Sequence, residues 1–296
     1  MGVRYGLKQD ENQLADELRS GARARLQLGE QTNRMTTVLV TGSTDGIGLR
    51  TAQVLAEQGN DVIVHGRSAA RVDAAVASIG SQAVAGIVAD LSDLDQVPEL
   101  AGAANSADVL INNAGIYERE RLTNADGEEV MWTVNHMAPS LLTALMLPEM
   151  PERGRVVYVS STAHGRGKFD LTDPGYAERR YNHFRAHMTT KLANLLMARE
   201  WARRQNRVDF FATHPGVIGT KLMTEGFQKE GANTLDEGAA ALIFAASSPS
   251  LTGQSGAFVV ENAVSEPTGP GLDDQLAAQV FDYTMEQLGL SGPQSP

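Results

Sequence analysis

The stretch "VLVTGSTDGIGL", residues 38–49, decides the fold class of this chain. A short apolar run leads into three glycines, Gly42, Gly46 and Gly48, and helix-forming sequence follows directly. Glycine lacks a Cβ, so it allows a tight turn whose backbone N–H groups approach a phosphate at the start of a helix. The spacing Gly-x3-Gly-x-Gly between a strand and a helix therefore predicts a nucleotide-binding turn. The residues expected to line it are Gly42, Ser43, Thr44, Asp45, Gly46, Ile47 and Gly48.

Further strand and helix patterns follow the first unit along the chain. The β-branched runs "DVIVHG", "AVAGIVAD", "DVLINNAG", "RVVYVSS" and "RVDFFATHPG" alternate with alanine-rich helical stretches. Near-continuous apolar strands separated by helices are typical of a parallel sheet covered on both faces. We therefore predict one doubly wound α/β domain of the Rossmann type over residues 35–289, with ligands bound beyond the carboxyl ends of its strands.

Two segments lie outside this alternation, residues 1–34 and residues 290–296. The first has helically spaced leucines, Leu14 and Leu18, among mixed charges, so we predict a helical N-terminal extension. It could pack on the domain or on a partner subunit, or it could precede a natural start at Met35. We assign no chemistry to this extension and treat residues 290–296 as a tail.

Composition narrows the class of protein. Hydrophobic residues make up 42% and charged residues 21%, as in an ordinary globular protein. The absence of cysteine excludes disulfides and thiolate chemistry and fits a reducing compartment. The net charge of −11 argues against nucleic acid as a partner, and no apolar run has the length of a membrane span. We expect a cytoplasmic protein with a small-molecule ligand and no metal, nucleic-acid or membrane partner.

The end of the second predicted strand, "VIVHGRS", bears on the choice of cofactor. An acidic residue about 20 positions after the glycine turn binds the ribose 2′-hydroxyl of NAD, whereas an arginine accommodates the 2′-phosphate of NADP. This chain has no acid there and carries Arg67 and Ser68 instead. An arginine at a strand end could be an ordinary surface residue. Together with the glycine turn, it predicts NADP(H).

Seven motifs now stand in a recognisable order. They are TGxxxGIG (residues 41–48), Asp90-Leu91, "NNAG" (112–115), "VNHMAPSLLT", "RVVYVSSTAHG", "TKLAN" and "THPGVIGTKL". In these the chain resembles the short-chain dehydrogenase/reductase superfamily, from about residue 36 to about residue 289, and within it the retinol-dehydrogenase-like branch. The resemblance implies further cofactor contacts. Asp90 and Leu91 would hold the adenine, Asn113, Ala114 and Gly115 would line the adenosine ribose, and Pro215, Gly216, Val217 and Thr220 would lie at the nicotinamide.

The resemblance also implies a reaction, hydride transfer between NADP(H) and a carbonyl or alcohol. Lys191 would bind the nicotinamide ribose, Ser161, the second serine of its pair, would orient the substrate oxygen, and Asn135 would hold a water of the proton relay. The tyrosine expected four residues before Lys191 is His187 in this chain. Because residues i and i+4 are neighbours on a helix, His187 and Lys191 should share one face.

Three interpretations of His187 stay open. It could be the general acid or base, although the neighbouring Lys191 disfavours the imidazolium form. Proton transfer could instead use water and Ser161, or the substrate could be an activated alkene or imine that needs little help. The site could also have lost ordinary redox chemistry, leaving an NADP(H)-binding sensor, scaffold or non-redox enzyme. Tyr176 and Tyr181, in the loop before this helix, are weaker candidates for the missing acid.

Substrate and assembly are the least determined features. The loop before His187 and the C-terminal segment from residue 264 would line the substrate cleft by the same resemblance. Their aromatic residues make a small apolar or aromatic substrate plausible, and these are Phe169, Tyr176, Tyr181, Phe184 and Phe227. A homodimer through the helices that hold "NHMAPSLLTALM" and "TTKLANLLMAREW" is possible. His164 receives no catalytic role.

Overall fold

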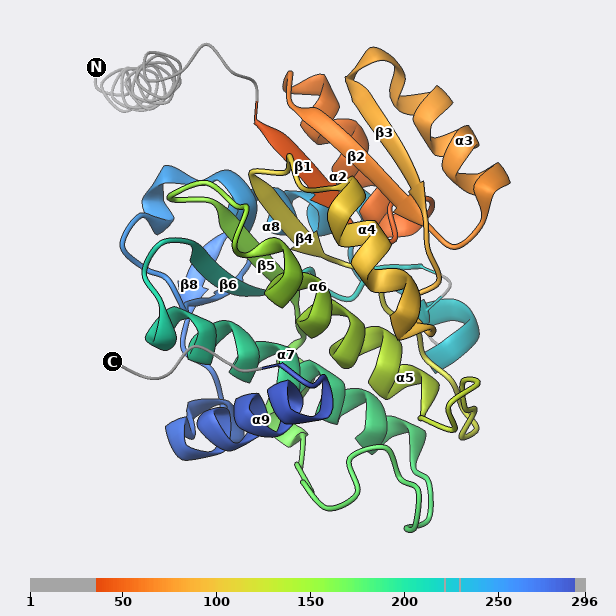
Figure 1. Cartoon of the computed structure of the whole chain (residues 1–296), viewed down its shortest axis with the longest axis vertical. Coiled ribbons are helices and arrows are strands. Elements are labelled where there is room, and N and C mark those ends of the chain that lie inside the picture. The colour runs from red at the N-terminus through yellow and green to blue at the C-terminus, as the bar shows by residue number, and fades with distance from the viewer. Residues whose placement is uncertain (1–35, 221, 229, 291–296) are drawn as a thin grey trace, which may run out of the picture. The chain divides into compact units, whose positions relative to one another are not determined.

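One eight-stranded sheet organises the domain, with the order β3-β2-β1-β4-β5-β6-β7-β8 (Figure 1). The computed structural model describes residues 36–290 except 221 and 229, so the predicted N-terminal extension lies outside the described residues, as does the tail beyond residue 290. All neighbouring pairs from β3 to β7 are parallel, and β8 is antiparallel to β7. The strands are β1 (Thr37–Val40), β2 (Asp61–Gly66), β3 (Ala83–Val88), β4 (Val109–Asn112), β5 (Arg155–Val159), β6 (Asp209–His214), β7 (Phe258–Val260) and β8 (Ala263–Ser265).

Helices cover both faces of this sheet. They are α2 (Gly46–Glu57), α3 (Ala69–Ile79), α4 (Val97–Ala103), α5 (Val130–Trp132), α6 (Ala138–Met146), α7 (His183–Arg204), α8 (Leu235–Ser247) and α9 (Asp274–Gln287). The alternation of side chains along β1 shows why two layers form. Val38 and Val40 pack with α2, α3 and α8, whereas Leu39 packs with α4, α6 and α7 on the other face. The predicted doubly wound sheet is confirmed.

The β7–β8 hairpin was not predicted from the sequence. Its two turn residues, Glu261 and Asn262, have φ angles of +50° and +59°. Two successive left-handed residues make the turn that matches the twist of an antiparallel pair. The turn sequence Glu-Asn lacks the glycine that usually signals such a hairpin, so the sequence did not predict an antiparallel strand at this edge of the sheet.

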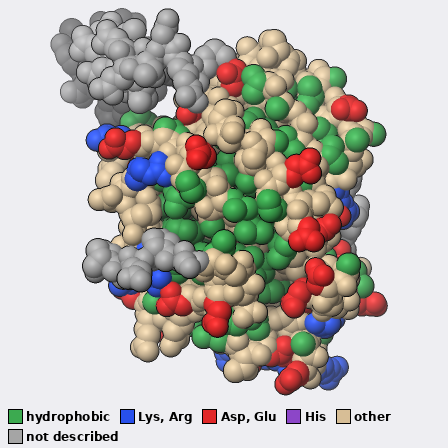
Figure 2. All heavy atoms as spheres, in the orientation of Figure 1, with side chains coloured by type: hydrophobic (Ala, Val, Ile, Leu, Met, Phe, Trp, Pro, Cys, Tyr) green, Lys and Arg blue, Asp and Glu red, His purple; other side chains and the backbone are tan. Residues whose placement is uncertain are grey.

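The surface of α7 is partly covered by the C-terminal helix. Trp201 of α7 meets Phe281 of α9 edge to face, with 4.9 Å between ring centroids. Apolar side chains gather at the centre of the face that carries α4 and α6 (Figure 2). The homodimer through α6 and α7 stays a prediction. No helix of the described residues is both long and apolar enough to cross a membrane.

Thr41 joins the first strand to the loop after β4 and so holds two predicted cofactor segments together. Its Oγ1 accepts hydrogen bonds from the backbone N–H groups of Asn113 and Ala114, each at 3.0 Å. The same hydroxyl donates to Ile111 O at 3.3 Å. The glycine turn and the "NNAG" loop therefore share one fully buried hydroxyl.

We predict that Thr41→Val lowers the free energy of unfolding by about 1–3 kcal/mol, because the N–H of Ala114 loses its acceptor. The N–H of Asn113, which also donates to Ile111 O at 2.9 Å, loses one of its two acceptors. Urea unfolding followed by circular dichroism measures the change. Thr51→Val is the matched control, because Thr51 is equally buried and its Oγ1 has no hydrogen-bond partner among the described residues. Thr51→Val should leave the free energy of unfolding unchanged or raise it. Equal losses in the two variants would contradict the role given to Thr41.

Candidate active site

The glycine turn forms a cradle at the N-terminus of α2. Gly42 and Gly46 have φ angles of +66° and +55°, a region that favours glycine. A Cβ on Gly48 would lie 2.4 Å from Gly42 O, so no larger residue fits there. Asp45 caps the helix, its Oδ1 accepting a hydrogen bond from Gly46 N at 2.8 Å. A backbone without Cβ atoms at the start of a helix fits a dinucleotide pyrophosphate.

His65 supports this cradle from β2, a role that sequence reasoning missed. Its Nδ1 accepts a hydrogen bond from Gly42 N at 3.1 Å. Since the backbone N–H can only donate, the ring proton is on Nε2, which donates to Ala89 O at 3.1 Å. Burial lowers the pKa of His65 to about 4, so the ring stays neutral. The only signal in the sequence was its position at a strand end, two residues before Arg67.

The end of β2 lies directly against the cradle. A Cβ on Gly66 would come within 2.5 Å of Thr44 Cγ2, so the two segments are in contact. Arg67 follows and is exposed. Ser68 is half-buried at the N-cap of α3 and makes no capping bond with its side chain. Both side chains predicted to receive a 2′-phosphate are thus next to the turn and open to a ligand.

Two more predicted segments meet the turn. A Cβ on Gly42 would lie 3.0 Å from Ala114 Cα, and one on Gly46 would lie 3.3 Å from Thr220 Cγ2. The backbone N–H of Val217 donates to Asn233 Oδ1 at 3.0 Å, which fixes the turn of the "HPG" segment. The structure therefore brings the "NNAG" loop and the segment after β6 to one edge of the sheet.

The Asp90-Leu91 pair lies at the same edge but only partly fits its expected role. Asp90 Oδ1 already accepts hydrogen bonds from the backbone N–H and hydroxyl of Ser92, at 2.9 and 2.8 Å. Leu91 is 5% exposed and belongs to the apolar core. Its side chain therefore fills the domain, which leaves little of it to pack on an adenine.

Helix α7 carries His187 and Lys191 on one face, as predicted. Lys191 is buried, and its ammonium donates to Val159 O, the last residue of β5, at 3.0 Å. Burial lowers the pKa of Lys191 to about 8. A Cβ on Gly115 would lie 3.7 Å from Lys191 Nζ and 3.4 Å from Asn135 Oδ1. The lysine, the asparagine and the "NNAG" loop are therefore in contact.

Asn135 fixes the backbone that follows "NNAG". It lies in a π-helical segment, Thr133–Met137, which precedes α6. Its Oδ1 accepts from Ile116 N at 2.8 Å, and its Nδ2 donates to Ile116 O at 2.9 Å. A π-helical turn commonly marks a functional site, because it re-aims a side chain from its helix. Here it turns an amide onto the chain beside Lys191.

The two serines after β5 have different surroundings. Ser160 is 2% exposed and donates to Lys191 O at 2.7 Å, so its hydroxyl is committed to α7. Ser161 is half-buried, and its Oγ accepts from Ala163 N at 3.1 Å, which leaves its own proton to donate. His164 braces this turn, with its Nδ1–H donating to Ser161 O and its Nε2 accepting from Thr268 N.

His187 lies in an apolar, aromatic environment. The rings of Tyr117 and Phe227 are each 5.2 Å from its ring, centroid to centroid, in edge arrangements. Its Nδ1 is buried and has no hydrogen-bond partner among the described residues. Desolvation and the charge of Lys191 lower the pKa of His187 to about 3. At neutral pH the imidazole is therefore neutral.

No nearby tyrosine takes the place of the missing one. The Tyr181 hydroxyl donates to the buried carboxylate of Glu129 at 3.0 Å. The Tyr117 hydroxyl lies 2.6 Å from His183 Nδ1. His183 is one helical turn before His187, whereas Lys191 is one turn after it, so this hydroxyl faces away from the lysine. Sequence reasoning missed the Tyr117–His183 pair because it joins a loop to a helix 66 residues away.

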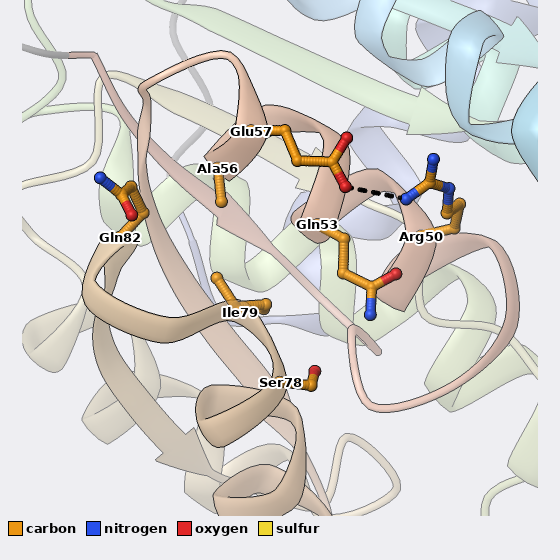
Figure 3. A pocket seen from close by; sticks show the side chains of 7 residues that line it. All are labelled: Arg50, Gln53, Ala56, Glu57, Ser78, Ile79 and Gln82. Carbon is orange, nitrogen blue, oxygen red and sulfur yellow. Dashed lines mark hydrogen bonds and ion pairs between the residues drawn. The ribbon is translucent and has the colours of Figure 1, made fainter.

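A surface hollow of the described residues lies away from this site. It has a volume of about 510 Å³, and Figure 3 shows Arg50, Gln53 and Glu57 of α2 facing Ser78, Ile79 and Gln82 across it. These residues include the end of α2, the end of α3 and the residue before β3, which lie at the amino ends of the strands. Ligands of doubly wound sheets bind at the carboxyl ends, so this hollow is not the active site. No cluster of three His, Asp or Glu side chains suitable for a metal occurs in the described part.

The neutral His187 generates a prediction about stability. The ring stays neutral in the folded protein down to about pH 3, whereas an unfolded histidine binds a proton below about pH 6.5. The free energy of unfolding therefore falls as the pH is lowered below 6.5, with each such histidine contributing up to about 1.4 kcal/mol per pH unit. We predict that His187→Gln reduces this slope by about that amount between pH 6 and 5, in urea unfolding at a series of pH values. Above pH 7 the curves of wild type and variant should run parallel, and unchanged slopes between pH 6 and 5 would contradict the buried neutral state.

Comparisons with known proteins agree with this geometry. The model of the short chain dehydrogenase family matches residues 36–231. A "Putative daunorubicin C-13 ketoreductase" of Streptomyces sp. (strain C5) is 33% identical over 266 residues, covering 86% of this chain and 92% of the relative. Human retinol dehydrogenase 14 is 30% identical over 295 residues, covering 86% of each chain.

Solved structures with a similar fold are found as well. The crystal structure of an uncharacterized protein from Mycobacterium Paratuberculosis superimposes with a TM-score of 0.73 and 32% identity, covering 88% of this chain and 95% of the other. A blue fluorescent protein from a metagenomic library, crystallised in complex with NADPH, superimposes with a TM-score of 0.61 and 25% identity over 76% of this chain and 95% of the other. The chain belongs to the short chain dehydrogenase family and is an oxidoreductase of that type.

Proposed function

We propose that the protein is an NADP(H)-dependent oxidoreductase that acts on the carbonyl or alcohol group of a small apolar or aromatic molecule. One observation carries this proposal. Lys191, Asn135 and the free hydroxyl proton of Ser161 are held at the carboxyl edge of the sheet, beside the glycine cradle. A module that only bound a nucleotide would have no need of the Ser161 hydroxyl. The ketoreductase and the retinol dehydrogenase among the relatives are named for reactions on ketone and alcohol groups.

The preference for NADP(H) rests on Arg67 and Ser68. Both follow Gly66, which lies against Thr44 of the turn, and neither position carries an acid that would bind a free 2′-hydroxyl. The glycine cradle would hold the pyrophosphate, and Lys191 would hold the nicotinamide ribose. When bound, the cofactor supplies or accepts the hydride.

Lys191 supplies positive charge where the substrate oxygen becomes negative. With a pKa of about 8, the ammonium is mostly protonated at pH 7. A buried cation stabilises developing negative charge more strongly than an exposed one, because little water screens it. The Ser161 hydroxyl can donate a hydrogen bond to the same oxygen. These two groups form the electrostatic part of the site.

The proton does not come from His187 in this account. A ring with a pKa of about 3 is imidazolium in roughly one molecule in 10⁴ at pH 7, so it is a poor acid. For the same reason it is a weak base for alcohol oxidation. Of the three interpretations of His187, we favour the second, in which water and Ser161 deliver the proton, and we add the Lys191 ammonium as a further candidate donor. Losing a positioned acid slows a reaction by about 10²–10⁴-fold without abolishing hydride transfer.

A second function is favoured by one observation. The rings of Tyr117 and Phe227 lie 4.0 Å apart, centroid to centroid, and both pack on His187. An NADP(H)-binding sensor, or a non-redox enzyme on this fold, would also have such a closed aromatic site. The oxidoreductase remains the better proposal because the free hydroxyl proton of Ser161 has no part in nucleotide binding alone.

His187→Tyr separates the two functions. We predict that the wild type reduces simple aldehydes and ketones slowly with NADPH, and that the tyrosine variant gains about 10²-fold or more, because an acid is restored beside Lys191. The loss of NADPH absorbance with a panel of carbonyl compounds measures the gain. Calorimetric titration with NADPH verifies that both proteins bind the cofactor.

His187→Phe is the matched control, because it fills the same space without a hydroxyl and should stay as slow as the wild type. A tyrosine variant that binds NADPH and stays inert would favour the sensor or non-redox function. A wild type as fast as the tyrosine variant would show that the tyrosine is dispensable here.

A further inference from the structure

An ion pair stands at the rim of the glycine cradle. Arg71 Nη2 of α3 lies 2.7 Å from Asp45 Oδ2, and each side chain is 49% exposed. The other carboxylate oxygen of Asp45 caps α2 by accepting from Gly46 N. The acid is thus fixed in the cradle by its own helix, while the arginine reaches it from the neighbouring helix.

This pair adjoins the place predicted for a 2′-phosphate. Arg67 and Ser68 follow β2, whose last residue, Gly66, is in contact with Thr44, the residue before Asp45. Arg67 precedes Ser68, the N-cap of α3, and Arg71 lies in the first turn of this helix, so the two residues flank the start of α3. The first turn of α3 contains no acidic residue, and its positive dipole end points to the same place.

The charges at this rim are uneven. Arg67 and Arg71 each carry one positive charge and Asp45 carries one negative charge, so these three side chains sum to +1 before any ligand binds. A half-exposed ion pair contributes little stability, whereas a phosphate with two charges forms stronger, often bidentate, bonds with arginine. Exchange of the Arg71 partner from Asp45 to a phosphate is therefore favourable.

We propose that Arg71 is a second determinant of cofactor choice. When NADP(H) binds, Arg71 breaks its ion pair with Asp45 and binds the 2′-phosphate together with Arg67. Asp45 competes with the 2′-phosphate for Arg71, so it reduces the preference for NADP(H) that the two arginines supply. The inference rests on the proposed NADP(H) site, but it does not depend on catalysis.

The adenosine half of the cofactor tests the inference without the nicotinamide end. Calorimetric titration of the full chain with adenosine 2′,5′-bisphosphate and with AMP compares ligands that differ by the 2′-phosphate. We predict that Arg71→Ala weakens binding of the bisphosphate by about 10-fold and changes AMP binding by less than about 2-fold. Asp45→Asn should strengthen binding of the bisphosphate by about 3-fold, because it removes the charge that competes for Arg71. Asparagine still caps α2, so the turn is kept.

Three comparisons make the test specific. Arg50→Ala removes the same charge from α2, where Arg50 pairs with Glu57 (Figure 3) and Asp236, and should leave the ratio of the two affinities unchanged. The gain from Asp45→Asn should be smaller in an Arg71→Ala background, because no competition for Arg71 remains. Arg71→Lys should restore part of the affinity for the bisphosphate.

The outcomes distinguish this inference from the proposed function. If Arg67→Ala abolishes the preference for the bisphosphate and Arg71→Ala does not change it, Arg71 has no role and the NADP(H) site stands. An equal gain from Asp45→Asn in both backgrounds would overturn the exchange. A wild type that binds both ligands equally, or neither, would overturn the cofactor assignment and the inference with it.

Discussion

A buried ammonium group sets the character of this site. The bond from Lys191 Nζ to Val159 O ties α7 to the end of β5, and Ser160 closes the contact by donating to Lys191 O. Desolvation lowers the pKa of both His187 and His214, and the charge of Lys191 lowers it further. Positive charge is therefore concentrated on one group, at the point where hydride transfer to a carbonyl would create an anion. A tyrosine at position 187 would use that charge to become a better acid, whereas a histidine is held neutral by it.

The two ends of the proposed cofactor site use charge differently. At the nicotinamide end the cation is buried and fixed by hydrogen bonds to the backbone, so its effect is strong and local. At the adenosine end the charges of Arg67, Arg71 and Asp45 are exposed, and their interactions are weak enough to be exchanged. The first arrangement suits chemistry on one oxygen atom. The second suits selection between cofactors that differ by one phosphate.

Much of the fold could be predicted because its signals are local. The apolar strands, the glycine turn and the four-residue spacing of His187 and Lys191 each depend on neighbouring residues, and the structure bears them out. Contacts between distant segments left no such signal. The aromatic packing of Tyr117 on His187, the tautomer of His65 and the pair of Arg71 with Asp45 each need the folded chain to bring separate elements together. The environment of His187, which decides its protonation, was therefore open until the structure supplied it.

The pH dependence of carbonyl reduction tests the central claim most directly, because it identifies which group carries the acidic proton. The rate at saturating NADPH should be measured for the wild type and for His187→Gln, with any carbonyl compound that the wild type reduces. The account predicts that both proteins lose rate as the pH rises through about 8, where the Lys191 ammonium deprotonates, and that their profiles coincide between pH 5 and 7. An inflection between pH 5 and 7 that is present in the wild type and absent from His187→Gln would contradict it, since His187 would then be the proton donor.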